Sequence, residues 1–309
     1  MVVRESIARD ILRLIIWYPF RWFILILPFP AAFYMLKVMG DTHYLFSRNK
    51  KRIIRENLSM VFNGRDSFPL NRILKMYFEN HYIDHLHIFL YPRFNKKTVE
   101  RYFPVHGLEN LNSALSHGRG CILLQGHFGP IQIPLFVLAL KGYNVKQIGY
   151  LWKPENLSLV GERVSLRLRA RYESMIPAEI LSAKSFLRSA FEILKDNGII
   201  MMNGDGAAGK QFIGKHIPVR FLGKEVLFPV GAINLARRTR SPILPLFIVR
   251  ESPWRFRIVI EKPSELNYTR EETDMGKGVE EFVRVFEGYV KRYPCHWHLW
   301  DEFKERIFS

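Results

Sequence analysis

The stretch that most constrains the fold is residues 120–135, GCILLQGHFGPIQIPL, in which a histidine with glycines nearby follows a short apolar run. The run from Cys121 to Leu124 is typical of a strand that is buried on both faces of a sheet. The glycines allow a tight turn, and Pro130 favours the first turn of a following helix. The sequence therefore predicts that His127 lies at a strand-to-helix corner, where open α/β sheets bind their ligands.

Strand-like and helix-like patterns alternate over residues 120–261, and an amphipathic helix pattern follows. This alternation predicts an α/β fold in which helices flank a sheet. The predicted strands are residues 121–124, 144–150, 199–202, 241–250 and 254–261, and the predicted helices are residues 49–62, 71–91, 161–173, 183–195, 229–237 and 278–293.

The N-terminal residues 11–39 are very apolar and aromatic, but Arg13, Arg21 and three prolines interrupt them. A helix that spans a membrane needs about 20 apolar residues without such breaks. Aromatic residues interleaved with cations suit a membrane interface. We therefore divide the chain into a membrane-associating helical segment, residues 1–45, and an α/β domain, residues 46–309. The alternative for the first segment is a buried pair of helices, and the sequence leaves peripheral and single-pass attachment open.

The formal charge of +17 and the pI near 9.9 predict an anionic partner. An anionic membrane surface, an acidic substrate and a nucleic acid all fit the charge alone. The two cysteines form neither a disulfide framework nor a CxxC metal motif.

The histidine pairs of the chain do not form a recognisable metal motif. His81 and His85 share a helical face, but the glutamate that follows the first histidine of HExxH zinc sites is missing. His296 and His298 would share a face in an extended segment, yet no third ligand accompanies them. We therefore predict no metal site.

A glycine-rich stretch, NGDGAAGKQ at residues 203–211, fits the GxGxxG spacing and part of the P-loop spacing. Both nucleotide motifs require a helix directly afterwards, with its N-terminus aimed at phosphates. The residues that follow are rich in glycine, proline and β-branched side chains, which predicts a loop and a hairpin instead. This excludes both nucleotide motifs and leaves Asp205 as a carboxylate at a strand end, on the same sheet edge as His127.

Several segments, in their order and spacing, resemble the lysophospholipid acyltransferase superfamily, and specifically its bacterial lipid A biosynthesis (lauroyl/myristoyl) acyltransferase branch. The resemblance implies a glycerolipid acyltransferase-like mixed sheet and an O-acyltransferase that needs no cofactor. Such enzymes move a fatty acyl chain from an acyl carrier protein or CoA thioester to a hydroxyl of a lipid or glycolipid, at the cytoplasmic face of the bacterial inner membrane. The segments are KRIIRENLSMVF, GHFGPIQ, RLRARYESM, FLGKEVLFPVGAINLAR, SPILPLFIVR and the closing W-x-x-W-D-E-F-K.

The resemblance also assigns roles around a motif of a histidine, four residues and an acidic residue. His127 is the implied general base, which removes the proton of the attacking hydroxyl. The acidic partner would hold the imidazole tautomer, and Gln132 occupies that position here. Five residues on one helix turn by about 140°, so His127 must precede the helix. Free N–H groups at the helix start would stabilise the oxyanion.

Glutamine carries no charge, so Gln132 is expected to be a weakened partner of His127. If so, Gln132→Glu raises turnover, unless another carboxylate such as Asp205 compensates. Arg169 and Asp205 match an arginine and an acidic residue that the family keeps near the site. We predict both as substrate-binding, with Gly129 at the corner. A structural ion pair is the alternative for Arg169 and Asp205.

Two other functions remain as alternatives. A non-catalytic or weakened lipid-binding homologue of the same fold is suggested by Gln132. A nucleic-acid-binding protein rests on charge and aromatic content alone, and we expect no nucleic acid partner.

Overall fold

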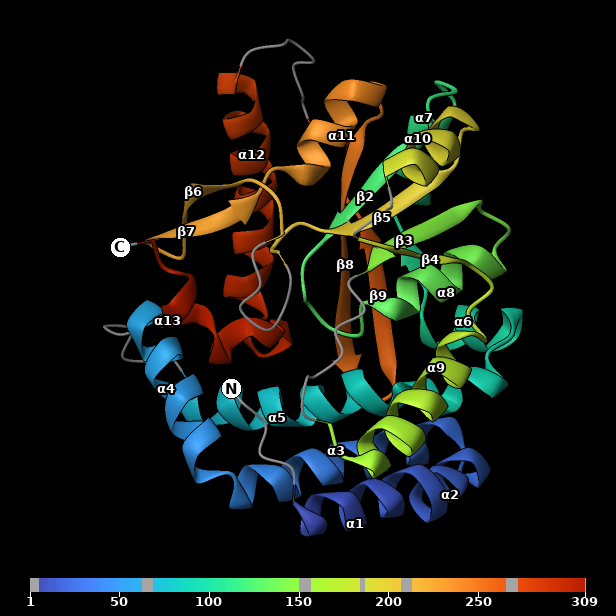
Figure 1. Cartoon of the computed structure of the whole chain (residues 1–309), viewed down its shortest axis with the longest axis vertical. Helices are drawn as coiled ribbons and strands as arrows, with labels where there is room; N and C mark the ends of the chain where they lie inside the picture. The colour runs from blue at the N-terminus through green and yellow to red at the C-terminus, as the bar shows by residue number, and fades with distance from the viewer. Residues whose placement is uncertain are drawn as a thin grey trace.

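The computed structural model describes residues 6–62, 69–149, 157–183, 187–206, 213–264 and 272–308. A seven-stranded sheet lies at its centre (Figure 1). The five strands from β8 to β4 are parallel to one another, β9 is antiparallel to β8, and β1 is parallel to β9. The predicted mixed α/β fold is confirmed. In spatial order the strands are β1 (Val105–His106), β9 (Arg255–Ile260), β8 (Ile243–Ser252), β2 (Cys121–Gln125), β5 (Ile199–Asn203), β3 (Val145–Gly149) and β4 (Ile180–Ser182).

Helices cover both faces of the sheet. One apolar core joins the sheet to α4 (Arg48–Phe62), α10 (Leu187–Lys195), α11 (Gly231–Thr239) and α12 (Glu272–Arg292). The opposite core joins it to α3 (Phe29–Phe46), α6 (Lys96–Tyr102), α7 (Leu108–Leu115) and α8 (Gln132–Leu140). Helix α5 (Leu70–Leu86) contributes to both cores. The remaining helices are α1 (Ile7–Ile15), α2 (Arg21–Ile26), α9 (Arg167–Glu173) and α13 (Phe303–Arg306). Short π- or 3₁₀-helices occupy Ile16–Phe20, His87–Arg93, Gly161–Leu166, Pro294–His296 and His298–Asp301.

Strand β2 is buried along its whole length, as its continuous apolar run predicts. Ile122 and Leu124 point into one core, whereas Cys121 and Leu123 point into the other. A strand that faces two cores cannot show the apolar–polar alternation of a half-exposed strand.

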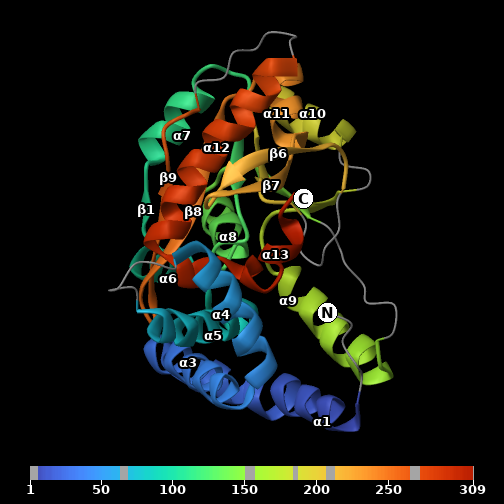
Figure 2. The ribbon, with the colours of Figure 1, turned by 90° about the vertical axis from the view of Figure 1, so that its left-hand side faces the viewer.

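The N-terminal helices α1 to α3 lie with α5 in a layer at one end of the sheet (Figures 1 and 2). Phe33 of α3 packs against Phe103 and against Phe256 of β9, with ring centroids 6.4 and 5.5 Å apart. The segment proposed as residues 1–45 therefore shares a core with the sheet, and its boundary falls near the end of α3. Across the described ranges, no helix has both the length and the apolar character needed to cross a membrane.

The hairpin predicted after the glycine-rich stretch is confirmed as β6 (His216–Phe221) and β7 (Lys224–Pro229), an antiparallel pair. Residues 207–212, which carry the second half of the two tentative nucleotide motifs, lie outside the described residues. The next described element is a strand rather than a phosphate-binding helix.

Candidate active site

His127 lies in the turn between β2 and α8, which confirms the predicted corner. At two positions in this turn the backbone lies so close to its neighbours that only glycine fits. A Cβ atom on Gly126 would lie 2.5 Å from a ring carbon of Phe286. Gly129 has a φ of +69°, which favours glycine, and a Cβ there would lie 2.8 Å from the carbonyl oxygen of Ile248. The close packing of this corner therefore fixes where the imidazole projects.

The imidazole of His127 is held by Asp205. Its Nδ1 lies 2.8 Å from Oδ1 of Asp205, and its backbone N–H donates to Oδ2 at 2.8 Å. Trp297 Nε1 also donates to Oδ2, at 3.1 Å. Asn203 Nδ2 lies 3.2 Å from Nε2 of His127, and an acceptor hydroxyl at this nitrogen would replace that contact. With Nδ1–H bound to the carboxylate, Nε2 keeps its lone pair, which is the arrangement a general base needs.

Asp205 is buried but charged. Burial by itself would raise the pKa of its carboxyl group, but the contacts with His127, together with the nearby charge of Arg306, hold that pKa below its usual value. Arg306 Nη1 also donates to the backbone carbonyl of Asp205 at 3.0 Å. The carboxylate is therefore available to stabilise an imidazolium ion.

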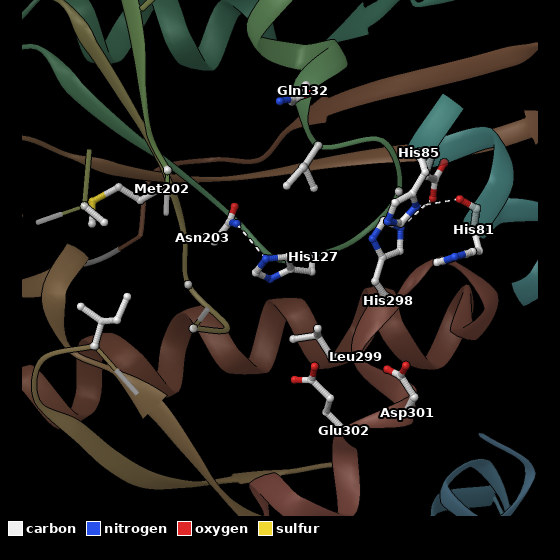
Figure 3. A pocket seen from close by; sticks show the side chains of 18 of the residues that line it. His81, His85, His127, Gln132, Met202, Asn203, His298, Leu299, Asp301 and Glu302 are labelled. Carbon is white, nitrogen blue, oxygen red and sulfur yellow. Dashed lines mark hydrogen bonds and ion pairs between the residues drawn. The ribbon is translucent and has the colours of Figure 1, made fainter. Parts of the chain in front are cut away.

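Gln132 does not take the place expected for the partner of His127. Its Nε2 donates to Oε1 of Glu173 at 3.1 Å, and its Oε1 accepts from the Tyr91 hydroxyl at 3.3 Å. Figure 3 shows Gln132 and His127 in separate parts of the pocket wall. The described contacts thus correct the predicted geometry: Asp205, not Gln132, accepts from the imidazole. The reason is the register Gln125↔Asn203 between β2 and β5, which brings the segments after both strands together.

The other predicted site residues, Arg169 and Gly129, line the same pocket as His127. Arg169 Nε donates to Glu173 Oε1 at 2.8 Å, the same oxygen that Gln132 contacts. The N–H of Gly129 donates to the His296 carbonyl at 2.9 Å. For an oxyanion, the next donors along the turn are the N–H groups of residues 131 and 132, which no backbone hydrogen bond engages within the described chain.

The pocket that contains His127 has a volume of about 1220 Å³ and two chemically different ends. Figure 3 shows His127 between Met202 on one side and a group of histidines on the other. An apolar end is lined by Ile148, Leu166, Ile180, Ala183 and Met202. A polar end is lined by Lys50, His81, Asp84, His85, His298, Asp301 and Glu302.

Sequence reasoning missed the part that the C-terminal tail plays. Trp297 contacts Asp205, and His298 enters the pocket, whereas His296 is buried and stacks on Phe128. His296 and His298 therefore do not share one face, because short 3₁₀-helices replace an extended segment here. The closing W-x-x-W pattern was the available signal, since buried tryptophans require partners for their N–H groups. In the described ranges no group of three ligand-type side chains is arranged to hold a metal ion.

Comparison with known proteins gives one family. The family described as "Bacterial lipid A biosynthesis acyltransferase" matches residues 5–304. No curated protein matches the chain. Among solved structures, the chain is similar to a 1-acyl-sn-glycerophosphate (LPA) acyltransferase, PlsC, from Thermotoga maritima. The two are 16% identical, the match covers 85% of this chain and 97% of that one, and the TM-score is 0.36.

Proposed function

Because the chain belongs to the bacterial lipid A biosynthesis acyltransferase family, we propose that His127 is its general base. The acyltransferase would move a fatty acyl chain from a thioester to a hydroxyl of a lipid or glycolipid. The observation that carries this proposal is the 2.8 Å contact between Nδ1 of His127 and the buried carboxylate of Asp205, inside a large pocket.

The reaction uses both nitrogens of His127. Nε2 takes the proton of the acceptor hydroxyl as its oxygen attacks the thioester carbonyl carbon. Asp205 stabilises the imidazolium that forms. The carbon–sulfur bond then breaks, and the imidazolium returns the proton to the leaving thiolate. General base catalysis of this kind contributes about 10² to 10⁴ in rate. The N–H groups of Ile131 and Gln132 would stabilise the oxyanion of the intermediate.

Gln132 is assigned a supporting role in this proposal. Its amide is held at both ends, by Glu173 and by Tyr91, so it shapes the pocket wall together with Arg169. The wall that these residues form would position the acceptor beside His127. The weakened-homologue alternative rested on the missing charge of Gln132, and the contact of Asp205 with His127 favours the enzyme instead.

The two ends of the pocket fit the two kinds of substrate group. The apolar end suits an acyl chain, because burying each methylene contributes about 0.8 kcal/mol. The polar end suits a head group with hydroxyls. The positive charge of the chain suits an acyl carrier protein or CoA as donor, since both are anionic.

Membrane association is part of the proposal. Large apolar side chains on α1 and α2 are exposed, Ile11, Ile15, Trp22 and Ile26 among them. A helix with such side chains binds in the interfacial region of a bilayer. We place the protein at the cytoplasmic face of the bacterial inner membrane.

The test is acyl transfer from a radiolabelled acyl-CoA or acyl carrier protein to detergent-solubilised lipid acceptors. His127→Ala is expected to abolish transfer. His117→Ala is the matched control, since His117 is exposed at the end of α7 and its ring contacts only the backbone of that helix. Full activity of His127→Ala would refute the assignment of the base.

A further inference from the structure

The polar end of the pocket contains a second histidine–aspartate pair. Nε2 of His298 lies 2.7 Å from Oδ2 of Asp84, and their side chains are 17% and 2% exposed. His127 and Asp205 show nearly the same construction, with a distance of 2.8 Å and exposures of 14% and 2%. In both pairs a buried carboxylate lies behind an imidazole that faces the pocket.

The backbone couples the second pair to the first. The N–H of His298 donates to the carbonyl oxygen of His127 at 2.8 Å. The Tyr77 hydroxyl donates to the carbonyl oxygen of His298 at 2.7 Å, which holds the tail from the other side. Figure 3 shows His298 next to His127 and directed toward His85. The two imidazoles therefore have a fixed relation to one another.

The free nitrogens at this end of the pocket are hydrogen-bond acceptors. Because Asp84 accepts from Nε2–H, Nδ1 of His298 carries a lone pair, and among the described residues no hydrogen bond engages it. His85 donates from Nδ1 to the His81 carbonyl at 2.7 Å, which leaves its Nε2 as an acceptor. The His85 and His298 rings are 5.9 Å apart. A ligand that satisfies both nitrogens must supply donors.

The charges around these nitrogens favour a neutral donor over a phosphate. Desolvation among the pocket residues, with smaller contributions from His298 and Arg169, lowers the pKa of His85, which favours a neutral ring at pH 7. Asp301 and Glu302 line the same end. The cations of the pocket lining are Lys50, Arg169 and Lys304. Nζ of Lys50 lies 3.8 Å from Asp301, and Nε of Arg169 donates to Glu173 at 2.8 Å, so both already face carboxylates. Hydroxyl groups satisfy such a set of acceptors, whereas an anionic group would meet carboxylates.

We propose that His298, oriented by Asp84, binds a second hydroxyl of the acceptor while His127 deprotonates the hydroxyl that becomes acylated. His298 thereby selects for acceptors that carry a hydroxyl close to the one that becomes acylated. This inference rests on the proposed acyl transfer. His298 binds and orients, and it takes no part in breaking the thioester.

The experiment compares two acceptors that differ by one hydroxyl, 1-decanol and 1,2-decanediol, with dodecanoyl-CoA or dodecanoyl carrier protein as donor. We expect the wild type to prefer the diol in kcat/KM by about tenfold, which is the effect of one hydrogen bond to a buried partner. His298→Phe is expected to remove this preference, so that kcat/KM for the diol falls to about that for 1-decanol. Asp84→Asn should reduce the preference, because the tautomer of His298 is no longer fixed, and His117→Phe should keep it.

If His298→Phe lowers kcat/KM equally for both acceptors, the proposal is overturned, because His298 would then only support the structure around His127. An unchanged preference in His298→Phe would overturn it as well.

If the wild type acylates neither acceptor, the proposed function fails, and calorimetric titration with the same two compounds still tests the site. Tighter binding of the diol by the wild type, lost in His298→Phe, supports the hydroxyl site. Equal binding of both compounds overturns it. Melting temperatures of all variants identify any that fail to fold.

Discussion

In the proposed mechanism, Asp205 is the residue on which the chemistry of His127 depends. Its carboxylate accepts from the imidazole, from the His127 backbone and from Trp297. Asp205→Asn is expected to lower kcat by about 10³ to 10⁴, because an amide stabilises neither the imidazolium nor the required tautomer. Initial rates of acyl transfer measure this loss. Asp196→Asn, at an exposed position that follows α10, should retain wild-type rates. A loss below tenfold would mean that another group orients His127.

Trp297 is expected to position Asp205 rather than to contact substrate, since it is buried behind the carboxylate. Trp297→Phe keeps most of the ring volume but removes one of the donors to Oδ2. We expect kcat to fall about tenfold, with KM unchanged, because a hydrogen bond to a charged group contributes about 1.5 kcal/mol or more. A KM increase with constant kcat would instead place Trp297 in substrate binding.

Helices α8 and α9 together carry one carboxylate on the pocket wall. Gln132 of α8 donates to Glu173 of α9. An acidic residue at position 132, as the resemblance would imply, would therefore lie next to the carboxylate of Glu173. The sequence does not show that Glu173 lies there, and it therefore predicts that Gln132→Glu raises turnover. The structure reverses the expectation, because two carboxylates about 3 Å apart repel each other.

The exchange of charge between these helices is testable. Gln132→Glu alone is expected to lower both the melting temperature and kcat/KM, the latter about tenfold. The double variant Gln132→Glu with Glu173→Gln should recover most of both, since the amide–carboxylate contact is restored in the opposite sense. Glu179→Gln is the matched control, as Glu179 is an exposed acid outside the pocket. Increased activity of the single variant would show that the contact between α8 and α9 is unimportant.

At the scale of the whole molecule, the exposed apolar side chains concentrate on the N-terminal helices. Trp22 and Ile26 of α2 are 60% and 77% exposed. Trp22→Glu and Ile26→Glu are each expected to weaken binding to phosphatidylglycerol-containing vesicles about tenfold, through lost apolar burial and added repulsion. Vesicle flotation measures this. Leu187→Glu, at an apolar residue of α10 that is 53% exposed, should bind like the wild type. An equal loss in that variant would point to a different membrane-facing surface.

Stability of the whole chain should depend on pH through its buried histidines. Burial, with smaller contributions from Arg169 and His298, lowers the pKa of His87 to about 3, and the ring of His296 has a value of about 3 for the same main reason. The unfolded chain binds these protons near pH ~6.5. The stabilisation is therefore complete above that pH and is lost as the pH falls toward 3, by about 1.4 kcal/mol per pH unit and histidine.

Urea unfolding at a series of pH values checks this dependence. His87→Phe should reduce the slope between about pH 6 and pH 4 by about 1.4 kcal/mol per pH unit, because one titrating ring is removed. His117→Phe, at an exposed ring outside both cores, is the control variant. An identical slope in His87→Phe and the wild type would contradict the assignment.

Local features of this protein are encoded directly in its residue patterns. Apolar runs and alternation identified β2, β5, β8 and β9, and the hairpin β6–β7 followed from its turn-forming residues. The corner at His127 was also predictable, because the glycines around it act within a few bonds of the chain. The resemblance of segment order to an acyltransferase family was likewise readable from the residues alone.

The sequence placed Asp205 and His127 at the same sheet edge, but the contact between them is fixed only by tertiary packing. Asp205 lies 78 residues away along the chain, and the two meet because β2 and β5 pair in parallel. Such pairing depends on the packing of helices on both sheet faces, which no local pattern encodes. The same holds for His298 and Asp84, which lie 214 residues apart and approach where the C-terminal tail crosses α5. The spacing of five residues from His127 predicted Gln132 as its partner. On helix α8, however, the Gln132 amide is directed toward Glu173 of α9.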